Sequence, residues 1–207
     1  WADTEDSHPN DFTQWSDVDG DGYGDNPGGT DPDACYGVVG NSTKGNRYGC
    51  IDSDGDGWDD TIDELPLLKH QWLDQDGDGY GDNATGPQPD ACPGEPGTST
   101  VDRYGCIDSD GDGISDENDA FPDDATRSSD IDGDGYDDLE DACMFVNGTS
   151  SIDRLGCNDS DGDGYSDGDG TWSSADGADA FPDEATQHAD QDSDGFGDNA
   201  AGFQADD

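Results

Sequence analysis

An Asp-rich pattern of nine residues occurs seven times in the chain and sets acidic side chains at regular intervals. Numbered from its first Asp, each copy has carboxylates at positions 1, 3, 5 and 9, Gly at position 6, and an aromatic residue or Ile at position 7. Carboxylates at this spacing, a glycine that allows a sharp turn and an inward main-chain carbonyl at position 7 can surround a hard cation that prefers oxygen ligands. Flexible coordination by many oxygens favours Ca²⁺ over Mg²⁺, and zinc would require neighbouring Cys and His, which the three His do not provide.

A further Asp follows each copy and completes the predicted ligand set. It stands at position 12 in three loops (Asp63, Asp119, Asp141), and beyond a longer connecting segment in four (Asp33, Asp90, Asp179, Asp206). We interpret all seven as one ligand reached by connecting segments of different length. The predicted metal ligands are Asp17, Asp19, Asp21, Tyr23, Asp25, Asp33; Asp52, Asp54, Asp56, Trp58, Asp60, Asp63; Asp74, Asp76, Asp78, Tyr80, Asp82, Asp90; Asp108, Asp110, Asp112, Ile114, Asp116, Asp119; Asp130, Asp132, Asp134, Tyr136, Asp138, Asp141; Asp159, Asp161, Asp163, Tyr165, Asp167, Asp179; and Asp190, Asp192, Asp194, Phe196, Asp198, Asp206.

The loops alternate between two kinds within a longer repeat. Loops of the first kind begin at Asp17, Asp74, Asp130 and Asp190, and loops of the second kind begin at Asp52, Asp108 and Asp159, just after a Cys. The predicted organisation is the end of a preceding unit at 1–16, units at 17–73, 74–129 and 130–189, and the start of a fourth at 190–207. Both ends fall inside a unit, and neither an initiator Met nor a signal peptide is present, so we expect a window onto a longer repetitive protein.

The composition excludes several classes of protein. Acidic residues number 55 against 6 basic ones, and 49 of the acids are Asp, which favours turns over helices. Such a field repels nucleic acid, and no apolar run reaches the length of a membrane span. Only 28% of residues are hydrophobic, so we expect no large hydrophobic core. Solvated disorder is the alternative for such a composition, but seven copies in register with a fixed Gly argue against it. EF-hands would need Glu at position 12 and flanking helices, which are missing here.

Six cysteines lie in pairs, one pair per unit, and the repeat favours disulfides within each unit: Cys35 with Cys50, Cys92 with Cys106, and Cys143 with Cys157. Disulfides indicate an oxidising compartment outside the cytoplasm. Sequons for N-glycosylation occur at Asn41, Asn83 and Asn147, and they support secretion modestly.

The alternation of DxDxDGxxDxxDxC, as at 130–143, with a second loop directly after the partner Cys resembles the thrombospondin type 3 repeat. The resemblance covers nearly the whole chain. It implies a secreted protein whose loops wrap Ca²⁺ with little regular secondary structure, tied by disulfides. The AFPD linkers at 120–123 and 180–183 look like those of long prokaryotic surface proteins that carry related arrays. The chain departs from the thrombospondins in its insertions, its local Cys pairing and the lack of their lectin-like domain.

The expected fold is therefore an elongated tandem array of Ca²⁺-wrapped loops, with little regular secondary structure, local disulfides and no large hydrophobic core. The expected function is that of an extracellular or cell-surface structural element, a stalk or filament-forming subunit that binds seven or more Ca²⁺ ions. We expect self-association into a fibre or longer array, possible glycans, and neither a nucleic-acid partner nor a membrane span in this segment. A Ca²⁺-dependent adhesion module is the alternative, and sequence differences between units that are confined to one insertion, such as 168–178, would favour it. A Ca²⁺ reservoir or mineral nucleator is a third hypothesis. No catalytic motif occurs, and His8, His70 and His188 all lie in linkers, so we do not expect an enzyme.

Overall fold

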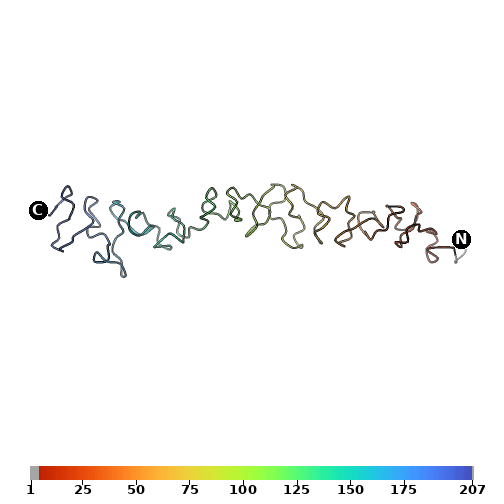
Figure 1. Ribbon diagram of the computed structural model, residues 1–207, viewed down its shortest axis with the longest axis horizontal. Coiled ribbons are helices and arrows are strands. Elements are labelled where there is room, and N and C mark those ends of the chain that lie inside the picture. Colours follow the sequence, from red (N-terminus) through yellow and green to blue (C-terminus); the bar gives the residue numbers. More distant parts are fainter. Residues whose placement is uncertain (1–4, 207) are drawn as a thin grey trace. The chain divides into compact units, whose positions relative to one another are not determined.

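The computed structural model describes residues 5–206, and these contain no helix and no extended strand (Figure 1). Regular pairing is limited to three isolated parallel bridges, between Gly24 and Pro32, Asp33 and Tyr48, and Gly197 and Ala205. The prediction of little regular secondary structure is confirmed. Residues 1–4 of the predicted segment 1–16, and Asp207 at the end of segment 190–207, lie outside the described residues.

The chain divides into two units, Trp1–Asn118 and Asp119–Asp207, and each unit is held together locally. The division falls inside the predicted repeat unit 74–129. The hydrogen bonds of residues 5–206 join groups that are at most 19 positions apart in the sequence. No helix capable of crossing a lipid bilayer occurs in the described part of the chain.

Three disulfides connect the cysteines as predicted, Cys35 to Cys50, Cys92 to Cys106, and Cys143 to Cys157. The sequence separations are 15, 14 and 14 residues, and the second cysteine of each pair is buried. Closing a loop of this size contributes about 3 kcal/mol by the chain-entropy model.

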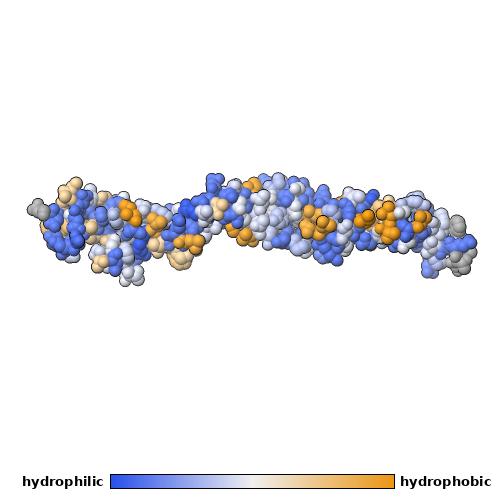
Figure 2. Space-filling model, viewed as in Figure 1, coloured by the Kyte–Doolittle hydropathy of each residue, from blue (hydrophilic) through white to orange (hydrophobic). Residues whose placement is uncertain are grey.

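The buried side chains are mainly polar. Besides the three cysteines, Ala178 is the one apolar residue among 5–206 that is buried, whereas Gln14, Asp59 and Ser42 are almost completely enclosed. Large apolar side chains lie at the surface, such as Leu139 at 92% exposure. Figure 2 shows them on the visible face as separate hydrophobic patches within a hydrophilic surface. Hydrogen bonds of polar groups therefore supply much of the internal contact.

The segment between paired cysteines is organised by a buried serine. The Cys50 amide donates to Oγ of Ser42 at 2.9 Å, and this hydroxyl donates to the carbonyl of Arg47. Ser99 and Ser150 make the same two contacts in the next two segments. The serine therefore fixes the turn that leads into the second cysteine.

An arginine in each of these segments ties the disulfide to the following loop. The guanidinium of Arg154 lies 3.4 Å from Sγ of Cys143 and forms an ion pair of 2.8 Å with Asp169. Arg47 and Arg103 make equivalent contacts with their disulfides, and they pair with Asp59 and Glu117. Three of the six basic residues thus have the same structural role.

Candidate metal centres

Each of the seven Asp-rich segments folds into the same closed loop. The amide of position 9 donates to the carbonyl of the residue before position 1, as from Asp25 to Ser16 at 2.9 Å. The amide of position 6 donates to Oδ2 of the first Asp in every loop, at 2.9–3.1 Å. The amide of position 7 likewise donates to Oδ1 of the Asp at position 5. One oxygen of each of these carboxylates is thereby fixed by the backbone.

Positions 4 and 6 require a left-handed backbone. The φ angles at position 6 lie between 87° and 103°, and this residue is always Gly. Position 4 is Gly in six loops, at 77–82°, but it is Ser193 at 62° in the last loop. Glycine adopts such angles without the clash that a Cβ atom causes, so the spacing of Asp and Gly creates the turn that gathers the carboxylates.

The first three acidic residues of a loop converge on one point. Carboxylate oxygens of Asp17, Asp19 and Asp21 all lie within 4.8 Å of one another. The same holds for the triplets that begin at Asp52, Asp74 and Asp108. Donor sets made of carboxylate oxygens are those that hard divalent cations prefer.

Many of these carboxylates keep a buried oxygen without a hydrogen-bond donor. Within residues 5–206, every buried side-chain oxygen that lacks a partner belongs to a predicted ligand: Asp19, Asp33, Asp54, Asp56, Asp82, Asp90, Asp110, Asp132, Asp161 and Asp179. An unpaired buried carboxylate oxygen is costly, and a bound cation would remove that cost. The residues present therefore fit a hard cation.

The last Asp reaches the same backbone position whatever the length of the connecting segment. Its amide donates to the carbonyl of position 8 in six loops, as from Asp63 to Asp59 and, across a longer segment, from Asp33 to Gly24, both at 2.9 Å. The pairs 90–81, 141–137, 179–166 and 206–197 repeat this bond at 2.8–3.0 Å. Asp119 accepts the amide of Phe121, as Asp63 accepts that of Leu65, and the ligand role of the last Asp stays a prediction in all seven loops. The hydrogen bond between the last Asp and position 8 is therefore the same for short and for long connecting segments.

The main-chain carbonyl of position 7 is available as a ligand. In the described part of the chain, none of the seven carbonyls of Tyr23, Trp58, Tyr80, Ile114, Tyr136, Tyr165 and Phe196 accepts a hydrogen bond. The side chains at position 7 also contribute to packing, because four of their rings contact a ring further along the chain. Tyr23 lies 5.7 Å from Tyr48, and Tyr80 lies 5.8 Å from Tyr104. The pairs of the second kind of loop are Trp58 with Trp72 at 5.9 Å and Tyr165 with His188 at 3.9 Å.

Electrostatics separate these carboxylates from the other acids. Burial, together with the charges of Asp163, Asp161 and Asp167, raises the pKa of Asp179 to about 6. The pKa values of seven more predicted ligands are raised, in each case by burial and by acidic neighbours in the same loop: Asp33, Asp54, Asp63, Asp82, Asp90, Asp141 and Asp161. Uncompensated negative charge therefore accumulates at the predicted ligands.

Seven acids outside the ligand set have lowered pKa values instead. Burial opposes ionisation of Asp102, but hydrogen bonds from Asn118 and Ser115 hold the pKa of this carboxyl far below its usual range. Hydrogen bonds from Arg154 and Thr171 do the same for the pKa of Asp169. The pKa values of Asp11, Asp59, Asp124, Asp137 and Asp153 are also lowered, and none of these residues is a predicted ligand.

The segment between the cysteines covers the loop of the first kind. The Gly40 amide donates to Oδ2 of Asp21 at 3.1 Å, and Gly97 and Gly148 repeat this contact with Asp78 and Asp134. A Cβ on Gly49 would lie 2.8 Å from oxygens of both Asp21 and Asp33. The disulfide-bonded segment is thus packed directly against the carboxylate cluster.

One further cluster of potential ligands does not suit a metal. Cys35, Cys50 and Asp59 lie close together, but both sulfurs are in a disulfide and Asp59 is paired with Arg47. A disulfide offers no thiolate, which is the form in which cysteine binds metals. The cluster is therefore structural.

The three sequons differ in structure. Nδ2 of Asn83 donates to the carbonyl of His70 at 2.6 Å, and the side-chain nitrogens of Asn26 and Asn199 make the same contact with residues 13 and 186. The Asn83 side chain thus has a repeated structural role that explains its presence. Asn41 and Asn147 are exposed.

Gln14, Gln71 and Gln187 are buried and hydrogen-bond to the connecting segments, and none of them belongs to the predicted ligand set. The signal was available, because each Gln lies three residues before a loop of the first kind and each of these loops has Asn directly after position 9. Comparison of the chain with models of known protein families and with functionally characterised proteins finds no match.

Proposed function

We propose that the chain is a Ca²⁺-binding structural element of an extracellular protein, a stalk or filament-forming part whose loops are ordered by ions and disulfides. The observation that carries this proposal is the set of buried, unpaired carboxylate oxygens, all of which belong to the predicted ligands. Oxygen ligands from carboxylates and a main-chain carbonyl match Ca²⁺, whereas Mg²⁺ retains several waters and zinc prefers sulfur and nitrogen. The three disulfides support a location outside the cytoplasm.

In this proposal the ions replace the missing partners of the carboxylates. Positions 1, 3, 5 and 9, the carbonyl of position 7 and the last Asp hold the cation, while backbone amides fix the remaining oxygens. Seven divalent ions would offset 14 of the 49 net negative charges, and the excess charge keeps the surface hydrated. The similarity of the loops to thrombospondin type 3 repeats belongs to the same proposal, as does association of such chains into a fibre or longer array.

Calorimetric titration of the chelator-treated chain with Ca²⁺ tests the proposal. We expect seven or more ions to bind, and Asp74→Asn combined with Asp76→Asn and Asp78→Asn to abolish binding at that loop only. Asp123→Asn, at an exposed acid outside the loops, is the charge control and should leave the number of ions unchanged. A chain that takes up no Ca²⁺ would contradict the proposal, and electron microscopy of the Ca²⁺-loaded chain tests fibre formation.

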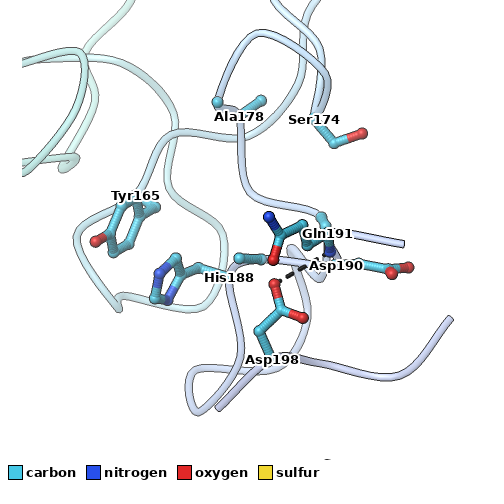
Figure 3. A pocket seen from close by; sticks show the side chains of 10 residues that line it. Tyr165, Ser174, Ala178, His188, Asp190, Gln191 and Asp198 are labelled. Atoms are coloured by element: carbon cyan, nitrogen blue, oxygen red, sulfur yellow. Dashed lines mark hydrogen bonds between the residues drawn. The ribbon is translucent and has the colours of Figure 1, made fainter. Parts of the chain in front are cut away.

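A recognition role is the second candidate, because one insertion forms a cavity. Residues 168–178, the longest of the connecting segments, contribute Ser174, Gly177 and Ala178 to a cavity of about 420 Å³. Figure 3 shows Tyr165 and His188 side by side in this cavity, with Asp198 accepting the Gln191 amide at 3.1 Å. An insertion that occurs in one repeat only is more typical of partner binding than of a uniform structural array.

Shortening that insertion separates the two roles. Exchange of residues 168–178 for the Leu-Glu pair found at 139–140 removes one wall of the cavity and leaves Asp179 as the last Asp. A structural element would keep its Ca²⁺ binding and its assembly after this exchange. Loss of cell or partner binding at unchanged Ca²⁺ content would instead support the adhesion role.

A further inference from the structure

Three buried glutamines precede three of the four loops of the first kind. Gln14, Gln71 and Gln187 stand three residues before Asp17, Asp74 and Asp190, and their exposed fractions are only 2%, 1% and 1%. A buried amide side chain normally satisfies its hydrogen-bonding groups, so its partners indicate its role.

The hydrogen-bond partners of these glutamine side chains lie in the connecting segment that leads to the last Asp. Nε2 of Gln14 donates to the carbonyls of Asn26 and Thr30 at 3.1 and 3.0 Å, and its Oε1 accepts the amide of Asn26 at 3.0 Å. Gln187 makes the same three bonds with Asn199 and Phe203, and Gln71 makes them with Asn83 and Pro87. One side chain therefore fixes both ends of a five-residue turn.

In each of the three loops that a glutamine precedes, two glycines make room for its side chain. A Cβ on Gly81, at position 8, would lie 2.2 Å from Oε1 of Gln71, and a Cβ on Gly86 would lie 2.5 Å from its Nε2. The pairs Gly24 with Gly29 and Gly197 with Gly202 surround the other two glutamines in the same way. Neither glycine of a pair has a left-handed backbone, so close packing is what excludes a side chain there.

The fourth loop of the first kind serves as a natural comparison. It has a short connecting segment, and Arg127 takes the place of the glutamine. Position 8 is Asp137 instead of Gly, and its Oδ2 accepts the amides of Ser128 and Ser129. Glutamine therefore occurs only where a loop of the first kind has a long segment to hold.

We propose that Gln14, Gln71 and Gln187 are positioning residues of the cation sites, which hold the connecting segment so that the last Asp of the loop (Asp33, Asp90 or Asp206) already points to the site before an ion binds. This inference rests on the proposed Ca²⁺ binding. The constant bond from the last Asp to the carbonyl of position 8 is the geometry that the glutamine preserves. Residues that orient metal ligands typically change metal affinity 10- to 100-fold when they are removed.

Variants of Gln71 in the full chain test the proposal. Gln71→Ala should weaken Ca²⁺ binding at one site by roughly 10- to 100-fold in a calorimetric titration and leave the other sites unchanged. It should also speed hydrogen exchange of the Asn83 and Asp90 amides in the chelator-treated protein, a readout that needs no metal. Gln75→Ala, an exposed glutamine at position 2 of the same loop, is the matched control and should change neither quantity.

A rescue variant distinguishes positioning from a general loss of structure. Gln71→Arg alone should weaken the site as Gln71→Ala does. Gln71→Arg combined with exchange of residues 81–90 for the sequence of residues 137–141 should restore affinity, because the short segment needs no glutamine. Unchanged affinity in Gln71→Ala, or no recovery in the combined variant, would overturn the inference while the wild-type chain still binds Ca²⁺. Failure of the wild-type chain to bind any Ca²⁺ would instead refute the proposed function.

Discussion

At the scale of single residues, the aspartates with a shifted pKa are of two kinds, and their surroundings differ. Asp33 and Asp90 each keep a buried oxygen without a donor, and burial and acidic neighbours raise their pKa values. Asp102 is exposed and Asp153 is half-buried, and hydrogen bonds from Asn118 and Ser115 to Asp102 and from Ser166 to Asp153 lower their pKa values. The same residue type therefore serves either as a candidate ligand or as a structural acceptor, and the supply of N–H and O–H donors determines which.

The raised pKa of Asp179 predicts a dependence of Ca²⁺ binding on pH. Burial and its acidic neighbours move this pKa from 3.8 to about 6 in the metal-free fold. The folded state then holds a proton that the unfolded chain releases, so the metal-free fold becomes more stable as the pH falls from 6 towards 4. If Ca²⁺ binds at this loop as proposed, it has to displace this proton, and its affinity there should fall about tenfold between pH 7 and pH 5.

Calcium titrations at the two pH values, in two buffers of different ionisation enthalpy, measure this coupling. We expect proton release on binding at pH 5 and almost none at pH 7. Asp179→Asn should weaken the site and remove the proton release that belongs to it. Equal affinity at both pH values without proton release would show that Asp179 does not bind the ion.

Ser193 is the one exception to Gly at position 4, and it predicts a stabilising substitution. The six glycines donate their amides to Oδ1 of the first Asp at 2.7–2.8 Å, but in this loop the amide of Asp194 takes that place at 3.1 Å. Ser193→Gly should relieve a left-handed backbone and stabilise the loop by about 1 kcal/mol. Hydrogen exchange of the Phe196 amide should then slow about fivefold. Gln191→Gly, at a position without left-handed φ, should speed that exchange slightly, and the same slowing in both variants would argue against relief of strain.

At the scale of elements, the segment between paired cysteines both closes a disulfide and covers an acidic loop. Gly105 illustrates the close contact, because its φ is 75° and a Cβ there would lie 2.5 Å from Oδ1 of Asp90 and 2.9 Å from Oδ2 of Asp78. Gly105→Ala should therefore destabilise the segment by about 1–2 kcal/mol and weaken Ca²⁺ binding at the loop that begins at Asp74.

Thermal unfolding and Ca²⁺ titration of Gly105→Ala measure these two effects. Gly170→Ala is the control, because a Cβ on Gly170 meets no atom within 4 Å and its φ is not left-handed. Wild-type affinity in Gly105→Ala would mean that the covering segment does not influence the site.

The comparison of sequence and structure is clearest for these elements. Spacing of like residues was enough to predict the disulfide between Cys92 and Cys106, because the repeat pairs neighbouring cysteines. It also indicated that Asp90 corresponds to Asp63 despite the longer segment, and both residues bond the carbonyl of position 8. The roles of Gln71 and Arg103 could not be read in this way. Their repeated positions indicate that they have a role, but residue type does not reveal which one, because their partners include backbone carbonyls, a disulfide sulfur and a glutamate.

At the scale of the whole molecule, contacts join residues that are close in sequence, whereas electrostatic repulsion acts along the whole chain. Within residues 5–206 hydrogen bonds join groups at most 19 positions apart, and the disulfides span 14 or 15, whereas a net charge of −49 acts on every segment. Carboxylates about 5 Å apart repel by roughly 1–3 kcal/mol per pair at effective dielectric constants of 20–80. Stability should therefore depend on ions bound loop by loop, since the buried side chains among residues 5–206 are mainly polar.

Removal of Ca²⁺ should accordingly expand the chain, and salt should partly reverse the expansion. In chelator at low ionic strength, unpaired carboxylates repel; raising the ionic strength from 0.1 M to 1 M shortens the screening length from about 10 Å to about 3 Å. Small-angle scattering should show a larger radius of gyration after chelation, a partial decrease with salt, and full recovery with Ca²⁺ but not with an equal concentration of Mg²⁺. Reduction of the three disulfides in chelator should expand the chain further, because each no longer restrains its loop. A radius that chelation leaves unchanged would mean that hydrogen bonds and disulfides alone hold the fold, and the carboxylate clusters would then need an explanation other than ion binding.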